Sequence, residues 1–91
     1  MRYARLSTYD ILKGTFPELT GIVGKGLLPT FSKVPGFIDH GLLDAGNNKV
    51  VAISIWETRD QMNAFKEAKP PEGTVALKSL SVEVFPMVEE P

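Results

Sequence analysis

The sequence contains no cysteine, and only one tryptophan and one histidine. Without cysteine the chain can form neither a disulfide nor a thiolate metal site, and it has no cysteine nucleophile. A single histidine, His40, with no second histidine beside it does not indicate a metal centre. No apolar run approaches the ~20 residues of a membrane-spanning helix, and residues 1–14 hold none long enough for a signal peptide. We therefore expect a soluble, cytoplasmic protein.

The chain also lacks an excess of charge of either sign. Ten basic and eleven acidic residues give a net charge of −1, so nothing in the charge balance favours nucleic acid or an anionic membrane as a partner. What is present, 43% hydrophobic and 23% charged residues, is typical of a globular chain. We expect one domain over residues 1–91 with an acidic tail at about 88–91. A domain of this size gains stability from a second subunit.

Two capping boxes predict the starts of two helices. Thr15 and Glu18 precede apolar residues at helical spacing that continue to Phe31. This first helix has low intrinsic propensity, because three glycines and Pro29 lie inside it, and Pro29 is expected to kink or end it. Thr58 and Gln61 form the second box, and its helix is expected to present Met62, Phe65 and Ala68 on one face before Pro70 stops it.

The glycines at positions 21, 24 and 26 permit three interpretations. A phosphate-binding loop would need Ser or Thr after Gly-Lys, and here Gly26 follows Lys25. The four residues Gly-Ile-Val-Gly match the nucleic-acid clamp of a KH domain, but the acidic balance of the chain disfavours that partner. The third interpretation is structural: small residues let the helix approach a neighbouring backbone closely.

Four strands are predicted, at residues 2–9, 37–43, 50–56 and 80–88. The polar loop 44–49 predicts that the second and third strands pair antiparallel as a hairpin. The order strand, helix, strand, strand, helix, strand predicts an α+β, ferredoxin-like (βαββαβ) fold, an antiparallel sheet with both helices on one face.

The third strand is apolar on both of its faces. Alternation places three residues on one face, Val51, Ile53 and Ile55, and four on the other, Val50, Ala52, Ser54 and Trp56. Helices cover one face of such a sheet, and an apolar second face requires a partner. We therefore expect a homodimer formed through the sheet faces.

The stretch VPGFIDHGLLDAGNNKVVAISIWETRDQMNAF resembles the antibiotic biosynthesis monooxygenase (ABM) domain family. Residues 35–37, Pro-Gly-Phe, match the family's turn, and residues 56–58, Trp-Glu-Thr, match its strand-to-helix junction. The resemblance implies a dimeric α+β barrel, in which two sheets pack face to face. It also implies a flat hydrophobic or aromatic ligand and monooxygenation without a cofactor.

Heme-degrading members of the family share the tryptophan, and this chain resembles them at Trp56. Those members also use an asparagine on the first strand and a histidine after the second helix. The first strand here, RYARLSTY, has no asparagine, and residues 66–79, KEAKPPEGTVALKS, have no histidine. Heme binding or degradation is therefore the least favoured of the functions that the resemblance suggests.

His40 is the candidate catalytic residue, because histidine is the side chain that titrates near neutral pH. As a general base it would take a phenolic or enolic proton, after which the carbanion reduces O₂ directly and no metal is required. The alternative is a hydrogen-bonded histidine at the sheet or dimer interface. Whether His40 and Trp56 share a face stays open, since parity cannot be carried across a hairpin of unknown register.

Four residues are candidates for substrate binding: Trp56 as a stacking wall, and Tyr3, Arg5 and Ser54 as orienting groups. Each has a structural alternative: Trp56 can anchor the strand-to-helix corner, Tyr3 can pack, Arg5 can reach solvent or an acid, and Ser54 can be a satisfied core hydroxyl. The alternative function is a ligand-binding or dimerisation module without turnover. The residues do not specify the substrate.

Overall fold

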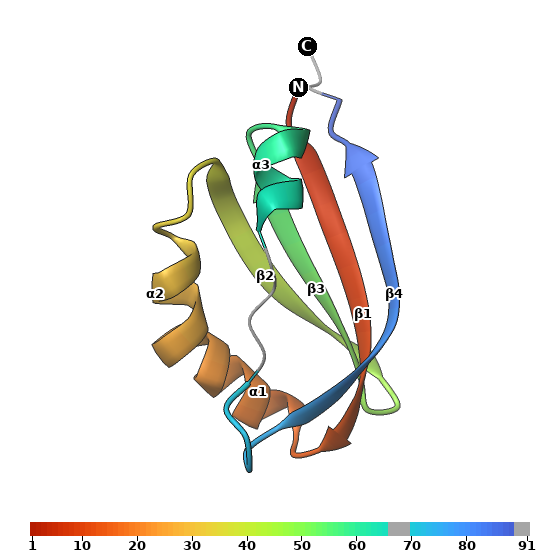
Figure 1. The fold of residues 1–91 in the computed structure, drawn as a ribbon. Helices are drawn as coiled ribbons and strands as arrows, with labels where there is room; N and C mark the ends of the chain where they lie inside the picture. The colour runs from red at the N-terminus through yellow and green to blue at the C-terminus, as the bar shows by residue number, and fades with distance from the viewer. Residues whose placement is uncertain (66–69, 89–91) are drawn as a thin grey trace.

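The computed structural model describes residues 1–65 and 70–88. Their elements follow the order β1 (Tyr3–Lys13), α1 (Phe16–Ile22), η1 (Val23–Leu27), α2 (Leu28–Phe31), β2 (Phe37–Gly46), β3 (Lys49–Trp56), α3 (Arg59–Ala64) and β4 (Ala76–Pro86). The strands form one antiparallel sheet in the order β2-β3-β1-β4, with the helices on one face (Figure 1). The predicted ferredoxin-like fold is thus confirmed. None of the helices in the described ranges is long and apolar enough to cross a membrane.

Both predicted helix starts are confirmed by their caps. The Thr15 hydroxyl accepts a hydrogen bond from the Glu18 N–H at 3.3 Å, and the Thr58 hydroxyl accepts one from the Gln61 N–H at 3.1 Å. The end of the second helix differs from the prediction: α3 stops at Ala64, and Phe65 has extended backbone angles (φ −83°, ψ 126°). Ala68 and the tail residues 89–91 lie outside the described residues.

The first helix changes its winding in the middle, because Pro29 cannot continue a regular α-helix. Proline lacks an N–H, and its ring clashes with the carbonyl four residues earlier, here that of Lys25. The chain widens into the π-helical turn η1, where the Leu28 N–H donates to the Val23 carbonyl. An added Cβ at any of the three helical glycines would meet no described atom within 4 Å, so the close-approach interpretation of these glycines is wrong.

The strands are longer than predicted at several ends. β1 continues to Lys13, β2 continues to Gly46, and β4 begins four residues earlier, at Ala76, although it also ends two residues earlier than predicted, at Pro86. The reason at the hairpin is its tight turn: only Asn47 and Asn48 lie between β2 and β3, and both have positive φ (51° and 59°). Such two-residue turns match the twist of the paired strands, so the pairing extends to the turn itself.

The Pro-Gly-Phe turn and the Trp-Glu-Thr junction form one unit in space. The Glu57 N–H donates to the Gly36 carbonyl at 2.8 Å. The Phe37 ring packs edge-on against Trp56, with ring centroids 5.6 Å apart. Gly36 has a φ of +83°, and a Cβ there would lie 2.1 Å from Gln61 Oε1 and 2.7 Å from its Cβ. This turn therefore requires glycine both for its conformation and for its contact with α3.

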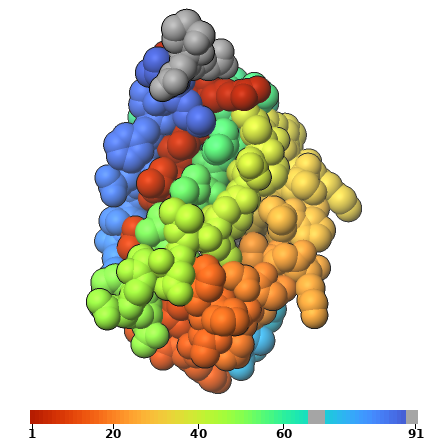
Figure 2. All heavy atoms as spheres, turned by 180° about the vertical axis from the view of Figure 1, so that it is seen from behind, coloured from red at the N-terminus to blue at the C-terminus, as the bar shows by residue number. Residues whose placement is uncertain are grey.

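The face of the sheet away from the helices is apolar at its centre. Its side chains come from all four strands: Ala4 and Leu6, Leu43, Val51, Ile53 and Ile55, and Phe85. We call this set the outer apolar patch. Figure 2 looks onto this face and shows the four strands side by side at the surface. An ion pair between Asp10 and Lys49 (2.9 Å) lies toward the hairpin end.

We expect Gly36→Ala to lower the free energy of unfolding by about 2 kcal/mol, because left-handed backbone disfavours a Cβ and the new methyl displaces Gln61. Gly24→Ala is the matched control, since its Cβ points into open space and alanine favours helix by up to about 1 kcal/mol. Urea denaturation followed by circular dichroism measures both. Equal effects of the two substitutions would contradict the role assigned to Gly36.

Candidate functional site

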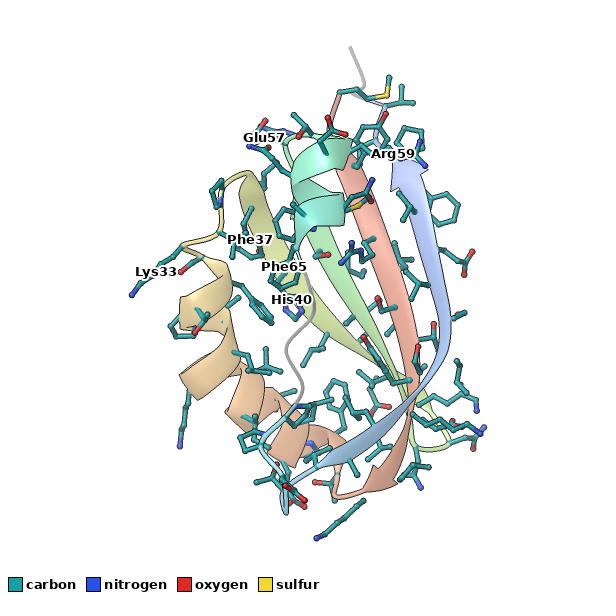
Figure 3. The ribbon with its side chains drawn as sticks, viewed as in Figure 1. Lys33, Phe37, His40, Glu57, Arg59 and Phe65 are labelled. Carbon is teal, nitrogen blue, oxygen red and sulfur yellow. The ribbon has the colours of Figure 1, made fainter. Side chains whose placement is uncertain are left out.

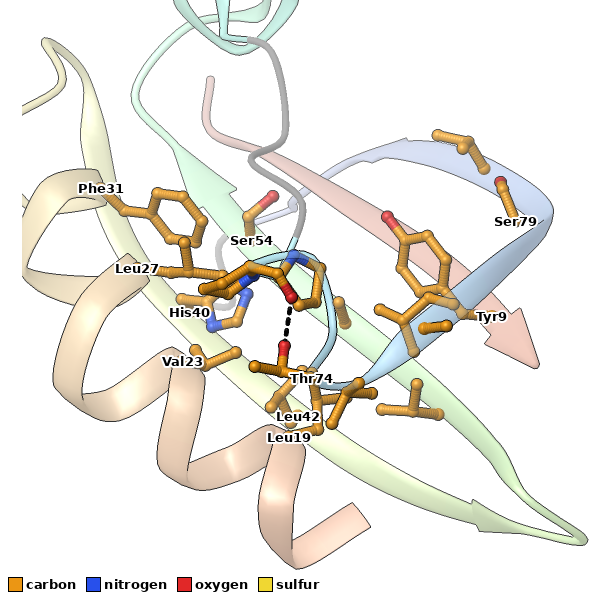
Figure 4. Close-up of a pocket in the computed structure, with 18 of the residues that line it drawn as sticks. Tyr9, Leu19, Val23, Leu27, Phe31, His40, Leu42, Ser54, Thr74 and Ser79 are labelled. Carbon is orange, nitrogen blue, oxygen red and sulfur yellow. Dashed lines mark hydrogen bonds between the residues drawn. The ribbon is translucent and has the colours of Figure 1, made fainter. Parts of the chain in front are cut away.

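A cavity of about 670 Å³ lies between the sheet and the helical segments (Figure 4). Val23, Leu27 and Phe31 line it from the helical side, and Leu42, Val50 and Ala52 line it from the sheet. Residues 70–77 border it as well, and among the described residues its lining includes the charged side chains of Lys13 and Glu72. The volume lies within the range of sites that hold small organic ligands.

The cavity exists because the centre of the inner sheet face carries small side chains. The strand register places Ala52 beside Ser7 and Leu42, and Ser54 beside Arg5 and His40. The buried core, by contrast, gathers at the hairpin end of the sheet: Ile11, Leu19, Val23, Val50 and Val75. Large side chains therefore fill the hairpin end of the space beneath the helices, and small ones leave its centre open.

Five rings border the open part and contact one another in sequence. Phe37 packs on Trp56 (5.6 Å between centroids), Trp56 on Phe65 (5.0 Å), Phe65 on Phe31 (5.1 Å), and Phe31 on His40 (5.5 Å). The series begins and ends on β2, so it curves around the cavity; we call it the aromatic arc. Figure 3 shows Phe37, Phe65 and His40 close together beside α2 and below α3. Because these rings meet edge-on or tilted, the arc presents both ring faces and ring edges to a flat ligand.

His40 projects into the cavity from the middle of β2, opposite Ser54. Burial lowers the pKa of His40 below its usual 6.5, and the charge of Asp39 opposes that shift. The imidazole is therefore neutral at pH 7. Within residues 1–65 and 70–88 the ring packs on Phe31 and receives no hydrogen bond from a protein group, so its nitrogens are available to a ligand. His40 and Trp56 line the same cavity, which the sequence had left open.

Trp56 and Ser54 hold each other in place. The indole is fully buried, and its Nε1–H donates to the Ser54 hydroxyl at 2.9 Å. Two residues apart on one strand, the two side chains share the inner face, as predicted. The indole therefore lies at the cavity wall with no accessible surface, and its N–H is bonded within the protein.

Tyr3 and Arg5 do not line the cavity. Tyr3 lies at the end of the sheet beside Trp56 and Pro86. Arg5 donates to the Met62 carbonyl at 2.8 Å and to the Phe65 carbonyl at 3.5 Å, and so serves the end of α3. The structure does not bring these two candidates together with His40 at the cavity surface.

Sequence reasoning missed Phe31 and Phe65, which both line the cavity. Phe31 and Phe65 belong to the apolar stripes of the predicted helices, and that pattern indicates a core position equally well. Tyr9 lines the cavity from the inner face of β1, which it shares with Tyr3 and Arg5, as the alternation of the strand predicts. No cluster of three or more metal-ligating side chains occurs among the residues the structure describes.

Comparison with known proteins supports the fold. No family model matches the sequence, and no curated protein matches it. In structure the chain is similar to SnoaB, a cofactor-independent oxygenase from Streptomyces nogalater, with a TM-score of 0.66 and 17% identity over 98% of this chain and 95% of that one. It is also similar to a Bacillus cereus protein described as a "putative antibiotic biosynthesis monooxygenase", with a TM-score of 0.61 and 18% identity over 100% and 95% of the chains. The chain has the ABM-type fold, as the sequence resemblance predicted.

The lowered pKa of His40 predicts how stability depends on pH. Between the pKa of the folded protein and the usual 6.5, the unfolded chain binds more protons than the folded one, so stability rises with pH across this window. We expect the free energy of unfolding to fall as the pH decreases below 6.5, and His40→Gln to remove this part of the decrease. Urea denaturation of both proteins at a series of pH values tests it, because the carboxylates common to both cancel. Parallel curves across this window would contradict the buried neutral imidazole.

Proposed function

We propose that the chain is a cofactor-independent monooxygenase that binds a flat aromatic molecule in the cavity. The observation that carries this proposal is that His40 and Trp56 line one cavity from adjacent strands. A neutral imidazole there can accept a proton, and the aromatic arc offers surfaces on which planar rings stack. The ABM-type fold, shared with a cofactor-independent oxygenase, supports the same reading.

The reaction is written for an enolisable ring that carries a CH₂ group. His40 takes the enolic or phenolic proton, and the resulting anion transfers electrons to O₂ and forms a C–O bond at the ring carbon. The imidazolium returns its proton to the peroxide, which loses water as the carbon becomes a carbonyl. The balance is CH₂ + O₂ → C=O + H₂O, so the substrate supplies all the electrons. The apolar walls suit O₂ and a neutral aromatic, and the charge of Asp39 stabilises the transient imidazolium.

The working unit is proposed to be a homodimer formed through the outer apolar patch. Leu43 and Phe85 of that patch are 51% and 47% exposed in the single chain, and the β3 side chains between them are half-buried. An apolar centre with charged residues at its margin is the pattern of a protein interface. A second copy, packed sheet to sheet, would cover the patch and leave the cavity, on the opposite face, accessible.

A binding module without turnover is the second candidate. It is favoured by the way the polar groups near the cavity are used: the Trp56 N–H is bonded to Ser54, and the Arg5 guanidinium to α3. Such a protein would bind the same ligands through the same arc. Turnover separates the two candidates.

Two substitutions test the enzyme with anthrone, an enolisable tricyclic ketone, as substrate and 1-naphthol as a binding probe. We expect His40→Gln to lower the rate of anthrone oxygenation by about 10²–10⁴-fold while 1-naphthol affinity changes little, because only the base is lost. We expect Ala52→Phe to abolish binding and turnover together, because its ring fills the cavity floor. Oxygen consumption measures turnover, and quenching of Trp56 fluorescence measures binding.

Ala45→Phe is the matched control for Ala52→Phe, since Ala45 is exposed at the hairpin end of β2 and lies outside the cavity lining. Binding of 1-naphthol with no oxygen consumption in the unmodified protein would favour the binding module. Turnover that survives in His40→Gln would remove His40 from the mechanism.

The dimer is tested separately. We expect the unmodified chain to have twice its monomer mass in native mass spectrometry, and Ile53→Lys to be a monomer, because the substitution places a charge at the centre of the outer apolar patch. Leu12→Lys is the control, as Leu12 is 65% exposed and lies beyond the Asp10–Lys49 pair. A monomeric unmodified chain, or a dimer that survives Ile53→Lys, would refute this interface.

A further inference from the structure

Arg5 contacts the backbone at the end of α3, next to the cavity-lining residue Phe65. Its guanidinium donates to the carbonyls of Met62 and Phe65, at 2.8 Å and 3.5 Å, where the chain leaves α3. The last four carbonyls of a helix have no partner within the helix, and a cation near them is electrostatically favourable. Because α3 has only six residues, this support from β1 acts on a large part of the helix.

Phe65 directly follows α3 and is the middle member of the aromatic arc. Its backbone is extended, and its ring packs on Trp56 at 5.0 Å and on Phe31 at 5.1 Å, the second contact being edge-on. The other four members of the arc are held by strands β2 and β3 or by helix α2. Phe65 is the C-cap of α3: its N–H donates to the Met62 carbonyl at 3.2 Å, and its own carbonyl accepts the Arg5 hydrogen bond.

We propose that Phe65 is an aromatic gate at the Trp56 end of the cavity, and that Arg5 is the positioning residue that holds its ring against Trp56 and Phe31. Phe65 bridges the helical side of the cavity, through Phe31, and the sheet side, through Trp56. Movement of this one ring would break both contacts and so separate the two sides. The identity of the ligand that passes the gate rests on the proposed function. The existence of the gate does not.

The chemistry of arginine suits this role. A planar guanidinium presents several N–H groups in a fixed fork and can reach two carbonyls at once. Lysine keeps the charge but acts as a single point, so Arg5→Lys retains the contact with the end of α3 without bridging both carbonyls. Methionine keeps the aliphatic stem and removes the donors.

Trp56 makes the gate directly measurable. It is the only tryptophan, it is fully buried, and Phe65 packs on its ring. Acrylamide quenching of its emission, at a temperature well below unfolding, reports how often the ring is uncovered. We expect Arg5→Met to raise the quenching constant at least about threefold through local opening, Phe65→Ala to raise it further, and Arg5→Lys to lie between Arg5→Met and the unmodified protein.

Arg2→Met is the matched control. Arg2 lies next to the start of the same strand and forms an exposed ion pair with Glu57 at 3.9 Å, so its loss removes the same charge without touching α3. We expect its quenching to equal that of the unmodified protein. Stopped-flow mixing with 1-naphthol is the second readout, in which association and dissociation should both accelerate in Arg5→Met.

The double variant Arg5→Met/Phe65→Ala decides whether Arg5 acts through Phe65. If it does, the double variant quenches like Phe65→Ala alone. Additive effects, or normal quenching and normal 1-naphthol kinetics in a merely less stable Arg5→Met, would overturn the proposal. Failure of anthrone oxygenation in the unmodified protein, with the quenching results as expected, would reject the proposed function and leave the gate.

Discussion

The register of the β2–β3 hairpin is the constraint on which the site depends. A turn of two residues, Asn47 and Asn48, sets His40 opposite Ser54 and so brings it to the face that carries Trp56. Because side chains alternate along a strand, a slip of one residue would place the imidazole on the outer face. Phe37 and His40 are three residues apart, so regular alternation would place them on opposite faces. The register shift between Phe37 and Asp39 lets both of them line the cavity.

The same sheet meets two opposite requirements. At its hairpin end the inner face is packed by Val50, Ile11 and the residues of α1 and η1, as a small domain needs for stability. Farther along, Ala52 and Ser54 leave room, and an open cavity forgoes part of the packing that the domain would otherwise gain. A protein of this size that keeps such a cavity has a physical reason to recover burial elsewhere, and the outer apolar patch offers the surface for it.

Local sequence patterns were sufficient to predict which segments form helices and strands, but not where those elements end. The capping threonines at 15 and 58 bond to nearby backbone groups, so sequence alone locates both helix starts. Arg5, which is 57 positions away from Met62 in sequence, donates to the carbonyl of Met62 at the end of α3, and no local pattern reports this contact. The role of Arg5 is also a long-range property. The sequence predicts which face of β1 its side chain takes, but whether it binds a ligand or the end of a helix depends on what packs above that face.

The sequence by itself determined the order of elements, the two-sided apolar third strand and the pairing of Ser54 with Trp56 on one face, because all of these depend on neighbours within a few residues. Only the tertiary structure decided that His40 meets Phe31, that Phe65 bridges Phe31 and Trp56, and that small side chains coincide over the centre of the sheet. Those contacts join segments whose relative positions are set by strand register and helix packing, and both of these are long-range properties of the folded chain.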